Sequence, residues 1–147
     1  MCTNLLVIGA SARAFAASAA RLGIKVNGID LFGDLDLREV CGRVVQVHAD
    51  DYPDGLPAIA ATFPESPVVY TGGLENHLKV LDALSSTRRI LGNVAKVVER
   101  VRDPAFVQKV AHENGCSYPE TFFSSAGLPK DGTYLKKPVL FLIYQQI

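Results

Sequence analysis

The chain has 147 residues, of which 48 % are hydrophobic and 20 % are charged. This length and composition predict a soluble globular protein with its own core, and they exclude a disordered tail. Fifteen basic and fifteen acidic residues give a formal net charge of zero, so the basic face of a nucleic-acid-binding protein is not predicted.

The cysteines and the amino terminus indicate the compartment. The chain has three cysteines, Cys2, Cys41 and Cys116. Their odd number and wide spacing favour a reducing cytoplasm over a disulfide framework or a zinc site. The alanine-rich start has no basic segment before its apolar stretch, and Arg13 interrupts that stretch, so we predict no signal peptide. No apolar run approaches the ~18 residues of a membrane span. We expect a cytoplasmic protein without a membrane or nucleic-acid partner.

Five short apolar runs in the first part of the chain predict strands. They cover residues 4–9, 24–30, 43–48, 66–71 and 88–93. Helical segments are predicted between them, at 11–23, within 51–64 and at 74–86, with a short helix or turn at 34–41. Strands that alternate with helices predict an α/β fold, with an open, mostly parallel, Rossmann-like sheet flanked by helices.

The pattern changes after Asn93. Residues 94–115 read as two helical segments broken at Asp103-Pro104, where Asp103 is a good N-cap and proline is tolerated in the first turn. An entry into a new strand is predicted at 116–125, a turn at 126–132 and an extended run at 133–144. We expect residues 1–92 to form one domain and 93–147 to begin another.

A ligand crevice is expected where the parallel strands end. The segment "GASARA" follows the first strand, and a dinucleotide site would use Gly-x-Gly-x-x-Gly there. Gly9 fits, but Ser11 and Ala14 stand at the other glycine positions, whereas Asp30 lies at the spacing of a ribose-binding acid. One alternative is a tight turn with small residues for close packing. Another is a helix start at which Ser11 and Arg13 hold a carboxylate or phosphate.

The segment "TGGLEN" follows the fourth strand and is expected at the same crevice. Its glycines free the backbone, and Glu75 can bind an amine or hydroxyl group. The alternative is that Glu75 complements the helix dipole and Asn76 caps the helix. We therefore take Gly9, Ser11, Arg13, Glu75 and Asn76 as candidate substrate-binding residues.

Two other groups of polar residues carry no site prediction. The three histidines are isolated in sequence and no pair has metal-ligand spacing, so no metal site is predicted. The segment "TRR" at 87–89 is more typical of a solvated strand edge than of an anion clamp.

Several segments, taken in order, resemble the entry into the catalytic part of ATP-grasp ligases. They are Gly92-Asn93, the conspicuous Asp103, the following helix near 106–113, the phrase "ENGCSYPET" at 113–121 and the pair Lys137-Pro138. The preceding residues 1–92 resemble the Rossmann-like domain that comes before the ATP-grasp domain in many of these enzymes. The resemblance therefore covers nearly the whole chain.

The resemblance implies a chemistry. ATP-grasp enzymes phosphorylate a carboxylate with ATP and Mg²⁺, and an amine or another nucleophile captures the acyl phosphate. By the same resemblance Lys137, with Lys136 as the one-residue alternative, contacts a nucleotide phosphate. The implied substrate is a small-molecule carboxylate, and no catalytic residue is identified.

The sequence also departs from the family pattern. Many relatives have a lysine directly after the helix-break Asp, but Pro104 stands there, with Arg102 or Lys109 as substitutes. Lys137-Pro138 is followed by "VLFLIYQQI" instead of a glycine-rich loop. We therefore expect the amino-terminal portion of a ligase, truncated, inactive alone and without tight ATP binding.

Two other hypotheses stay open. One is a free-standing Rossmann-like module that binds a nucleotide or anion without catalysis. The other is an interaction domain whose apolar C-terminal run pairs with another copy, which would give a homo-oligomer.

Overall fold

The structure is a computed structural model that describes residues 4–122, 124, 126–129, 131–132 and 134. Its internal contacts divide the chain into two compact units, Met1–Val98 and Glu99–Ile147. The predicted boundary near Gly92 falls just before helix α5 (Ala95–Val101), which begins in the first unit and ends in the second.

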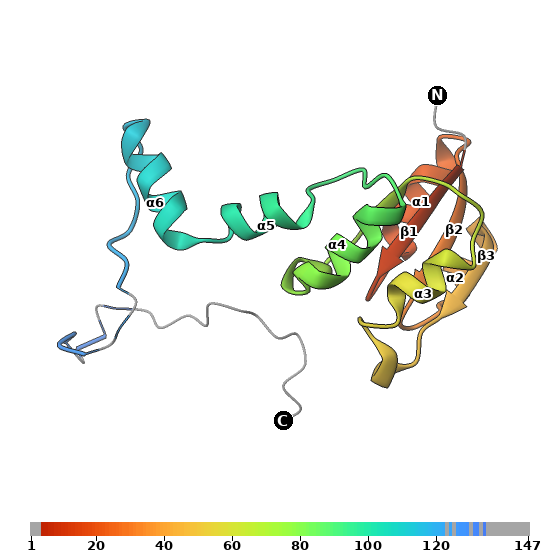
Figure 1. Cartoon of the computed structure of the whole chain (residues 1–147), viewed down its shortest axis with the longest axis horizontal. Coiled ribbons are helices and arrows are strands. Elements are labelled where there is room, and N and C mark those ends of the chain that lie inside the picture. The colour runs from red at the N-terminus through yellow and green to blue at the C-terminus, as the bar shows by residue number, and fades with distance from the viewer. Residues whose placement is uncertain (1–3, 123, 125, 130, 133, 135–147) are drawn as a thin grey trace. The chain divides into compact units, whose positions relative to one another are not determined.

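The first unit is built on a four-stranded parallel sheet with the order β3-β2-β1-β4 (Figure 1). Its strands are β1 (Asn4–Gly9), β2 (Lys25–Asp30), β3 (Cys41–Gln46) and β4 (Val68–Tyr70). Leu6 of β1 is in register with Asn27 of β2 on one side and with Val68 of β4 on the other. The predicted parallel α/β fold is confirmed.

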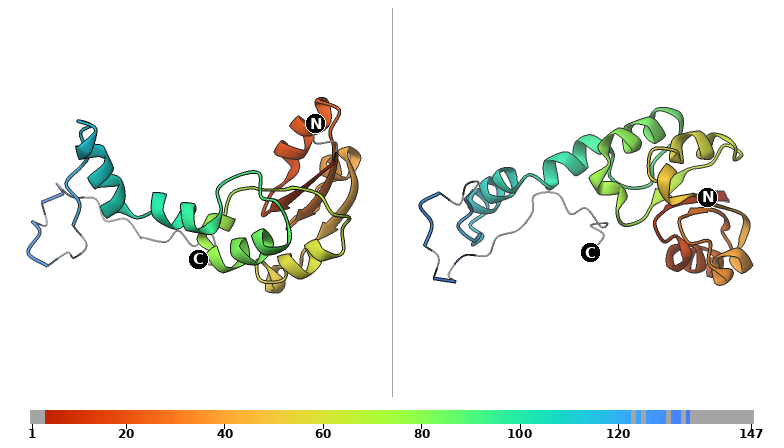
Figure 2. Two further views of the ribbon diagram at one scale, coloured as in Figure 1. Left: turned by 45° about the horizontal axis from the view of Figure 1, so that its top comes forward. Right: turned by 90° about the horizontal axis from the view of Figure 1, so that it is seen from below.

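Helices cover both faces of this sheet (Figures 1 and 2). One face carries α1 (Arg13–Arg21) and α2 (Leu35–Val40), and the other carries α3 (Leu56–Ala61) and α4 (Leu78–Thr87). Accordingly β1 is buried along all of its length after Asn4, as its unbroken apolar run predicts. Leu6 and Ile8 pack in the core on the α3 and α4 face, while Leu5 and Val7 pack on the α1 and α2 face.

The long helices follow the sequence periodicity. In α1, the buried face consists of alanines, Ala16 and Ala19, which lets the helix lie close to the sheet. The helix is followed by Gly23 in a left-handed conformation with φ 74°, as expected for a helix terminus. The leucine pattern of 74–86 is divided between the 3-10 helix η2 (Leu74–Asn76) and α4, and it buries Leu81 and Leu84.

Other expectations were wrong in detail. The third strand begins two residues earlier than predicted, at Cys41. The helix predicted within 51–64 is present as α3, and it is preceded by the 3-10 helix η1 (Ala49–Asp51), which was not predicted. The fifth strand is reduced to one parallel bridge between Val68 and Ile90. Among the described residues of 116–125 there is no strand. The N-cap residue of α1 is Ala12, and no side chain accepts a hydrogen bond at this cap.

The second unit contains the end of α5 and the helix α6 (Pro104–Glu113). The predicted cap is confirmed, because the Asp103 side chain accepts a hydrogen bond from the Ala105 amide at 2.9 Å. The guanidinium of Arg100 stacks over the ring of Phe106, 4.2 Å from its centroid. Among the helices of the described part of the chain, none is long and apolar enough to cross a membrane.

Candidate functional site

The carboxyl ends of β1 and β4 bring two loops together. The strand order reverses between these neighbours, which in open α/β sheets is the usual place of a ligand site. Thr71, directly after β4, donates from Oγ1 to the carbonyl of Ser11 at 3.0 Å. Its amide donates to the carbonyl of Ile8 at 2.8 Å. We call residues 9–13 and 71–76 the loop pair.

Gly9 makes the close approach of the two loops possible. It is buried at the end of β1, and a Cβ atom at this position would collide with Thr71 Oγ1. The small residue therefore serves packing between the loops, as in the tight-turn alternative.

Asp30 is the buried charge beneath the loop pair. Its side chain is fully buried, and one carboxylate oxygen accepts a hydrogen bond from the amide of Ala12 at 2.6 Å. The other oxygen accepts from the amides of Phe32 at 2.7 Å and Gly33 at 2.6 Å. The carboxylate thus holds the start of α1 and the turn after β2. It is committed to the backbone and is not presented to a ribose.

Glu75 lies in η2, within the other half of the loop pair. Its Oε2 accepts a hydrogen bond from the amide of Gly73 at 2.7 Å. Gly73 has φ 102°, a conformation that side-chain-bearing residues rarely adopt, so the glycine is needed for this turn. Glu75 and Asn76 are both half-buried. Asn76 is not the N-cap of α4, because that position is occupied by His77.

Tyr70 connects the loop pair to the segment before α5. Its hydroxyl donates to the carbonyl of Asn93 at 2.8 Å. Burial, and then the negative charge of Glu75, raise the pKa of Tyr70. The Tyr70 hydroxyl therefore remains protonated, with its hydrogen committed to the backbone.

Arg13 lies at the rim of the loop pair, among acids. Its Nε is 3.8 Å from Asp34 and its Nη1 is 3.5 Å from Asp36, and all three side chains are at least one-third exposed. Exposed pairs of this kind contribute little to stability. The pairs nevertheless offset the positive charge that Arg13 would offer to an anion. Ser11 is exposed beside it.

Cys41, at the start of β3, is a half-buried thiol. Burial, and then the negative charge of Asp30, raise its pKa from 9.0 to about 11. It is protonated at neutral pH and is a poor nucleophile. By contrast Cys116 in the second unit is exposed.

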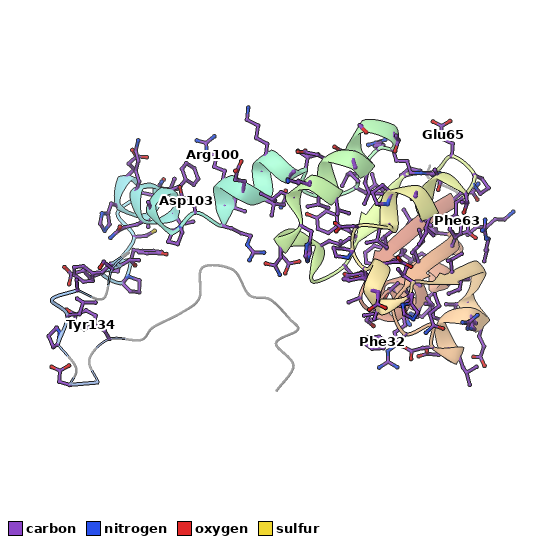
Figure 3. The ribbon with its side chains drawn as sticks, turned by 60° about the horizontal axis from the view of Figure 1, so that its bottom comes forward. Phe32, Phe63, Glu65, Arg100, Asp103 and Tyr134 are labelled. Carbon is purple, nitrogen blue, oxygen red and sulfur yellow. The ribbon has the colours of Figure 1, made fainter. Side chains whose placement is uncertain are left out.

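The opposite, amino edge of the sheet carries two hollows. One, of about 550 Å³, runs past Glu65 and Arg89, and the other, of about 500 Å³, runs past Lys25 and Glu65. Figure 3 shows Glu65 and Phe32 at opposite ends of the first unit, and Phe32 lies two residues after the carboxyl end of β2. The hollows are therefore remote from the loop pair.

Beside the first hollow, Arg88 has a structural role that the sequence did not reveal. Its guanidinium donates to four backbone carbonyls at 2.8–3.3 Å, those of Ala60, Phe63, Pro64 and Ser66. The interpretation of residues 87–89 as a solvated edge was thus wrong for Arg88, although Arg89 is exposed. Arg88 fixes the connection between α3 and β4.

The structure brings most of the predicted site residues to one edge. Gly9, Ser11 and Arg13 lie in the segment from the end of β1 to the first residue of α1, and Glu75 and Asn76 lie in η2 after β4. Lys136 and Lys137 lie outside the described residues. Thr71 was not predicted as a contact between the loops, since only the pairing of β1 with β4 brings it to Ser11. Among the described residues, no group of three or more His, Cys, Asp or Glu side chains could hold a metal ion.

Comparisons with known proteins find similar folds among solved structures. No protein-family model matches the sequence, and no curated protein matches it. Solved structures do match. The biotin carboxylase domain of Hydrogenobacter thermophilus 2-oxoglutarate carboxylase, solved with MgADP and bicarbonate, is 18 % identical with a TM-score of 0.60, over 78 % of this chain and 28 % of that one.

Two further structures agree. Staphylococcus aureus N5-carboxyaminoimidazole synthetase is 20 % identical with a TM-score of 0.56, over 77 % of this chain and 30 % of that one. Rhizobium etli pyruvate carboxylase is 16 % identical with a TM-score of 0.59, over 82 % of this chain and 13 % of that one. The chain thus spans less than a third of each of these proteins. These neighbours are ATP-grasp ligases, so the predicted resemblance is confirmed at the level of the fold.

Proposed function

We propose that residues 4–98 are the amino-terminal domain of an ATP-dependent carboxylate–amine or related ligase that acts through an acyl phosphate. The observation that carries the proposal is the match in fold, at a TM-score of 0.60, to a biotin carboxylase domain. The sequence order supports the proposal independently, because Asp103, the following helix and Lys137-Pro138 occur in the order that the family shows.

The loop pair is the proposed substrate contact of this domain. The bound molecule would contact Gly9, Ser11, Glu75 and Asn76, with Arg13 at the rim of the site. The support is topological, because both loops follow neighbouring parallel strands at the reversal of strand order. The hydrogen bond between Thr71 and Ser11 keeps the two loops together. The proposed substrate is a small-molecule carboxylate, and the proposed enzyme is a cytoplasmic homo-oligomer.

The nucleotide and the metal are proposed to bind outside the loop pair. The described residues do not fit a magnesium site, because no suitable acidic group gathers among them. Lys137, or Lys136, remains the proposed contact of ATP phosphate by resemblance. The helix-break position that carries a lysine in many relatives is Pro104, and the substitute Lys109 lies 3.8 Å from Glu113. We therefore propose that the 147-residue chain alone performs no ligation and binds ATP weakly.

Hydroxylamine trapping tests the proposed reaction. An acyl phosphate reacts with hydroxylamine to give a hydroxamate, which iron(III) colours. The protein is isolated from the organism that encodes it and is incubated with MgATP, hydroxylamine and a panel of carboxylates that includes bicarbonate, with ADP release measured in parallel. Carboxylate-dependent ADP release, with hydroxamate formed from an organic acid, supports the proposal. ADP release with no dependence on any carboxylate contradicts it.

Calorimetry with MgATP on the 147-residue chain tests the second part. An exposed phosphate–lysine contact contributes only ~1 kcal/mol, whereas millimolar affinity requires about 4 kcal/mol. We expect no binding in the micromolar range. Micromolar binding that Lys137→Ala abolishes would show that a competent nucleotide site already exists in this chain.

A further inference from the structure

We propose that two copies of this chain associate through the outer edge of β3 and so join their sheets into one continuous sheet. This inference rests on the proposed homo-oligomer, because it names the surface that would form it. It follows from a difference between the two outer strands of the sheet, β3 and β4 (Figure 1).

The outer edge of β4 is covered by the chain itself. The amide of Val68 donates to the carbonyl of Arg89 at 2.8 Å, and the amide of Leu91 donates to the carbonyl of Val68 at 2.7 Å. Both outward backbone groups of Val68 are therefore paired with residues 89–91. This edge offers little to a strand of another molecule.

The outer edge of β3 is open. In a parallel pair of strands, alternate residues direct their backbone groups to the neighbouring strand. The amide of Val47 donates to the carbonyl of Asp30 at 2.9 Å, so Val47 faces β2. By alternation Val45 also faces β2, whereas Val44 and Gln46 direct their backbone groups outward. Within the described part of the chain, these outward groups have no hydrogen-bond partner.

The long polar side chains of β3 are engaged with their own subunit. Natural edge strands are often protected by charged side chains that project along the edge. The guanidinium of Arg43 instead donates to the carbonyl and the hydroxyl of Thr62 at 2.9 and 3.2 Å, and it lies 4.2 Å from the centroid of the Phe63 ring. The side-chain amide of Gln46 donates to the carbonyl of Leu31 at 3.3 Å. Neither side chain therefore blocks the approach of a further strand.

A second copy of β3 matches these open groups. Two strands that are related by a two-fold axis run antiparallel, and each uses the same surface. With the axis beside Val45, the backbone of Val44 in each copy exchanges both hydrogen bonds with Gln46 of the other copy. The segment is regular enough for this pairing, because residues 44–46 pair in order with 28–30 and the register shift of β3 lies before them.

The side chains favour the same register. The two Val45 side chains would face each other as a non-hydrogen-bonded pair, the closer kind of antiparallel pair. Val44 and Val45 are half-buried and pack on the two core clusters of the sheet, so the pairing would extend their burial. Arg43 would lie opposite Val47 of the other copy, so the two like charges do not face each other. A highly charged peptide would not provide these apolar contacts, which favours a second copy as the partner.

Disulfide crosslinking of the full chain tests this register. In a background with Cys2→Ser, Cys41→Ser and Cys116→Ser, we expect Val45→Cys to give a crosslinked dimer on mild oxidation. The Cα atoms of a non-hydrogen-bonded pair lie ~4.5 Å apart, which a disulfide can span. Leu22→Cys is the control, because Leu22 is 80 % exposed and random collisions would crosslink it more readily than the half-buried position 45. Equal crosslinking of the two variants would overturn the inference.

Analytical ultracentrifugation of edge variants gives a second test. Val44→Pro removes an outward amide that does not bond to β2, and proline is tolerated at such positions of an edge strand. Val44→Ala is the matched control, because it shortens the side chain but keeps the amide. We expect Val44→Pro to weaken dimerisation about tenfold or more relative to Val44→Ala, since each copy loses one cross-strand donor. Circular dichroism shows whether each variant is folded, and if Val44→Pro is not, the crosslinking decides.

The outcomes separate this interface from the other proposals. Equal dimer affinity of folded Val44→Pro and Val44→Ala would overturn the inference and leave the homo-oligomer standing. A dimer that is lost on deletion of residues 139–147 but kept in Val44→Pro would assign the contact to that apolar run, and would also overturn it. A monomeric wild-type chain would contradict both the interface and the homo-oligomer. The trapping assay reports on the ligase reaction independently of the oligomeric state.

Discussion

The carboxylate of Asp30 at the end of β2 accepts a hydrogen bond from the amide of Ala12 at 2.6 Å, across 18 residues of sequence. The same buried group also holds the amides of Phe32 and Gly33. One side chain therefore fixes two of the turns at the carboxyl edge of the sheet. Its removal would leave three backbone donors without their acceptor.

We expect Asp30→Ala to lower the free energy of unfolding by about 3 kcal/mol or more, because each buried donor left unsatisfied costs ~1–3 kcal/mol. Urea unfolding followed by circular dichroism measures the change. Asp36→Ala is the control, since Asp36 is exposed and such changes usually stay within ~0.5 kcal/mol. Equal stability of the two variants would contradict the role assigned to Asp30.

The contact between Gly9 and Thr71 gives a coupled prediction. Gly9→Ala should cost about 1–3 kcal/mol, because the new methyl group collides with Thr71 Oγ1. In a Thr71→Ala background the colliding oxygen is gone, so the same change should cost less. A double-mutant cycle from urea unfolding gives the coupling energy.

Gly72→Ala is the control for this cycle, because a Cβ at Gly72 would meet nothing within 4 Å. It should leave stability nearly unchanged in both backgrounds. A cost for Gly9→Ala that is the same with and without Thr71 would show that the two loops are not packed as described.

Arg88 and Arg89 form a natural pair for comparison. Arg88→Met should destabilise the first unit by about 2–4 kcal/mol, because four carbonyl groups lose a charged donor while the aliphatic part of the side chain is kept. Arg89→Met should change stability by less than ~0.5 kcal/mol, because the Arg89 side chain is exposed. Differential scanning calorimetry of both variants decides the matter, and a small effect of Arg88→Met would argue against the clamp.

The two described cysteines should differ sharply in reactivity. In a Cys2→Ser background at pH 8, Ellman's reagent should modify Cys116 first, because that thiol is exposed. Cys41 has a pKa of about 11, so its thiolate fraction at pH 8 is on the order of 100-fold below that of an ordinary thiol. Mass spectrometry of the partly modified protein identifies the site. Equal rates would show that Cys41 is neither buried nor electrostatically suppressed.

The same pKa shift predicts a dependence of stability on pH. The folded pKa of Cys41 lies above its ordinary value of 9.0, so the unfolded state loses this proton first. The stabilisation is therefore fully present below pH 9 and is lost as the pH rises toward about 11. Cys41→Ser should lose less stability than the wild type over this range, as measured by urea unfolding at each pH.

Local sequence patterns correctly predicted the buried first strand, the cap of α6 and the apolar face of α4. The run 4–9 is buried on both faces, and Asp103 caps α6 as its position before Pro104 suggested. The same holds for the leucine pattern of α4. These features need only a few neighbouring residues, which is why they can be predicted without knowledge of the tertiary structure.

The errors lie where tertiary pairing decides. Gly42 is a weak strand former, yet it joins β3 together with Cys41 because β2 lies beside them, with an irregular register between Val26 and Gly28. Conversely, the apolar run around Ile90 forms only one bridge, to Val68. Its neighbour β4 is only three residues long, so it provides few residues for strand pairing.

The sequence predicted that the two loops lie at the same edge of the sheet, as the structure shows, but it did not predict the interactions that they make. The spacing of Asp30 suggested a ribose contact, whereas its oxygens are taken up by three amides. No short motif encodes this arrangement, because Ala12 contributes only its backbone. Thr71 was expected at the crevice, but its contact with the other loop was not predicted for a related reason, because its partner is the backbone carbonyl of Ser11.

The strand order has a consequence for synthesis of the protein. β1 leaves the ribosome first, and Leu6 can pair with Asn27 of β2 soon afterwards. Its other neighbour, Val68 of β4, is translated much later. At ~5–20 residues per second, one edge of the most apolar strand stays without its partner for several seconds on every nascent chain. Chaperone demand during translation should therefore peak before β4 emerges and fall once it has docked.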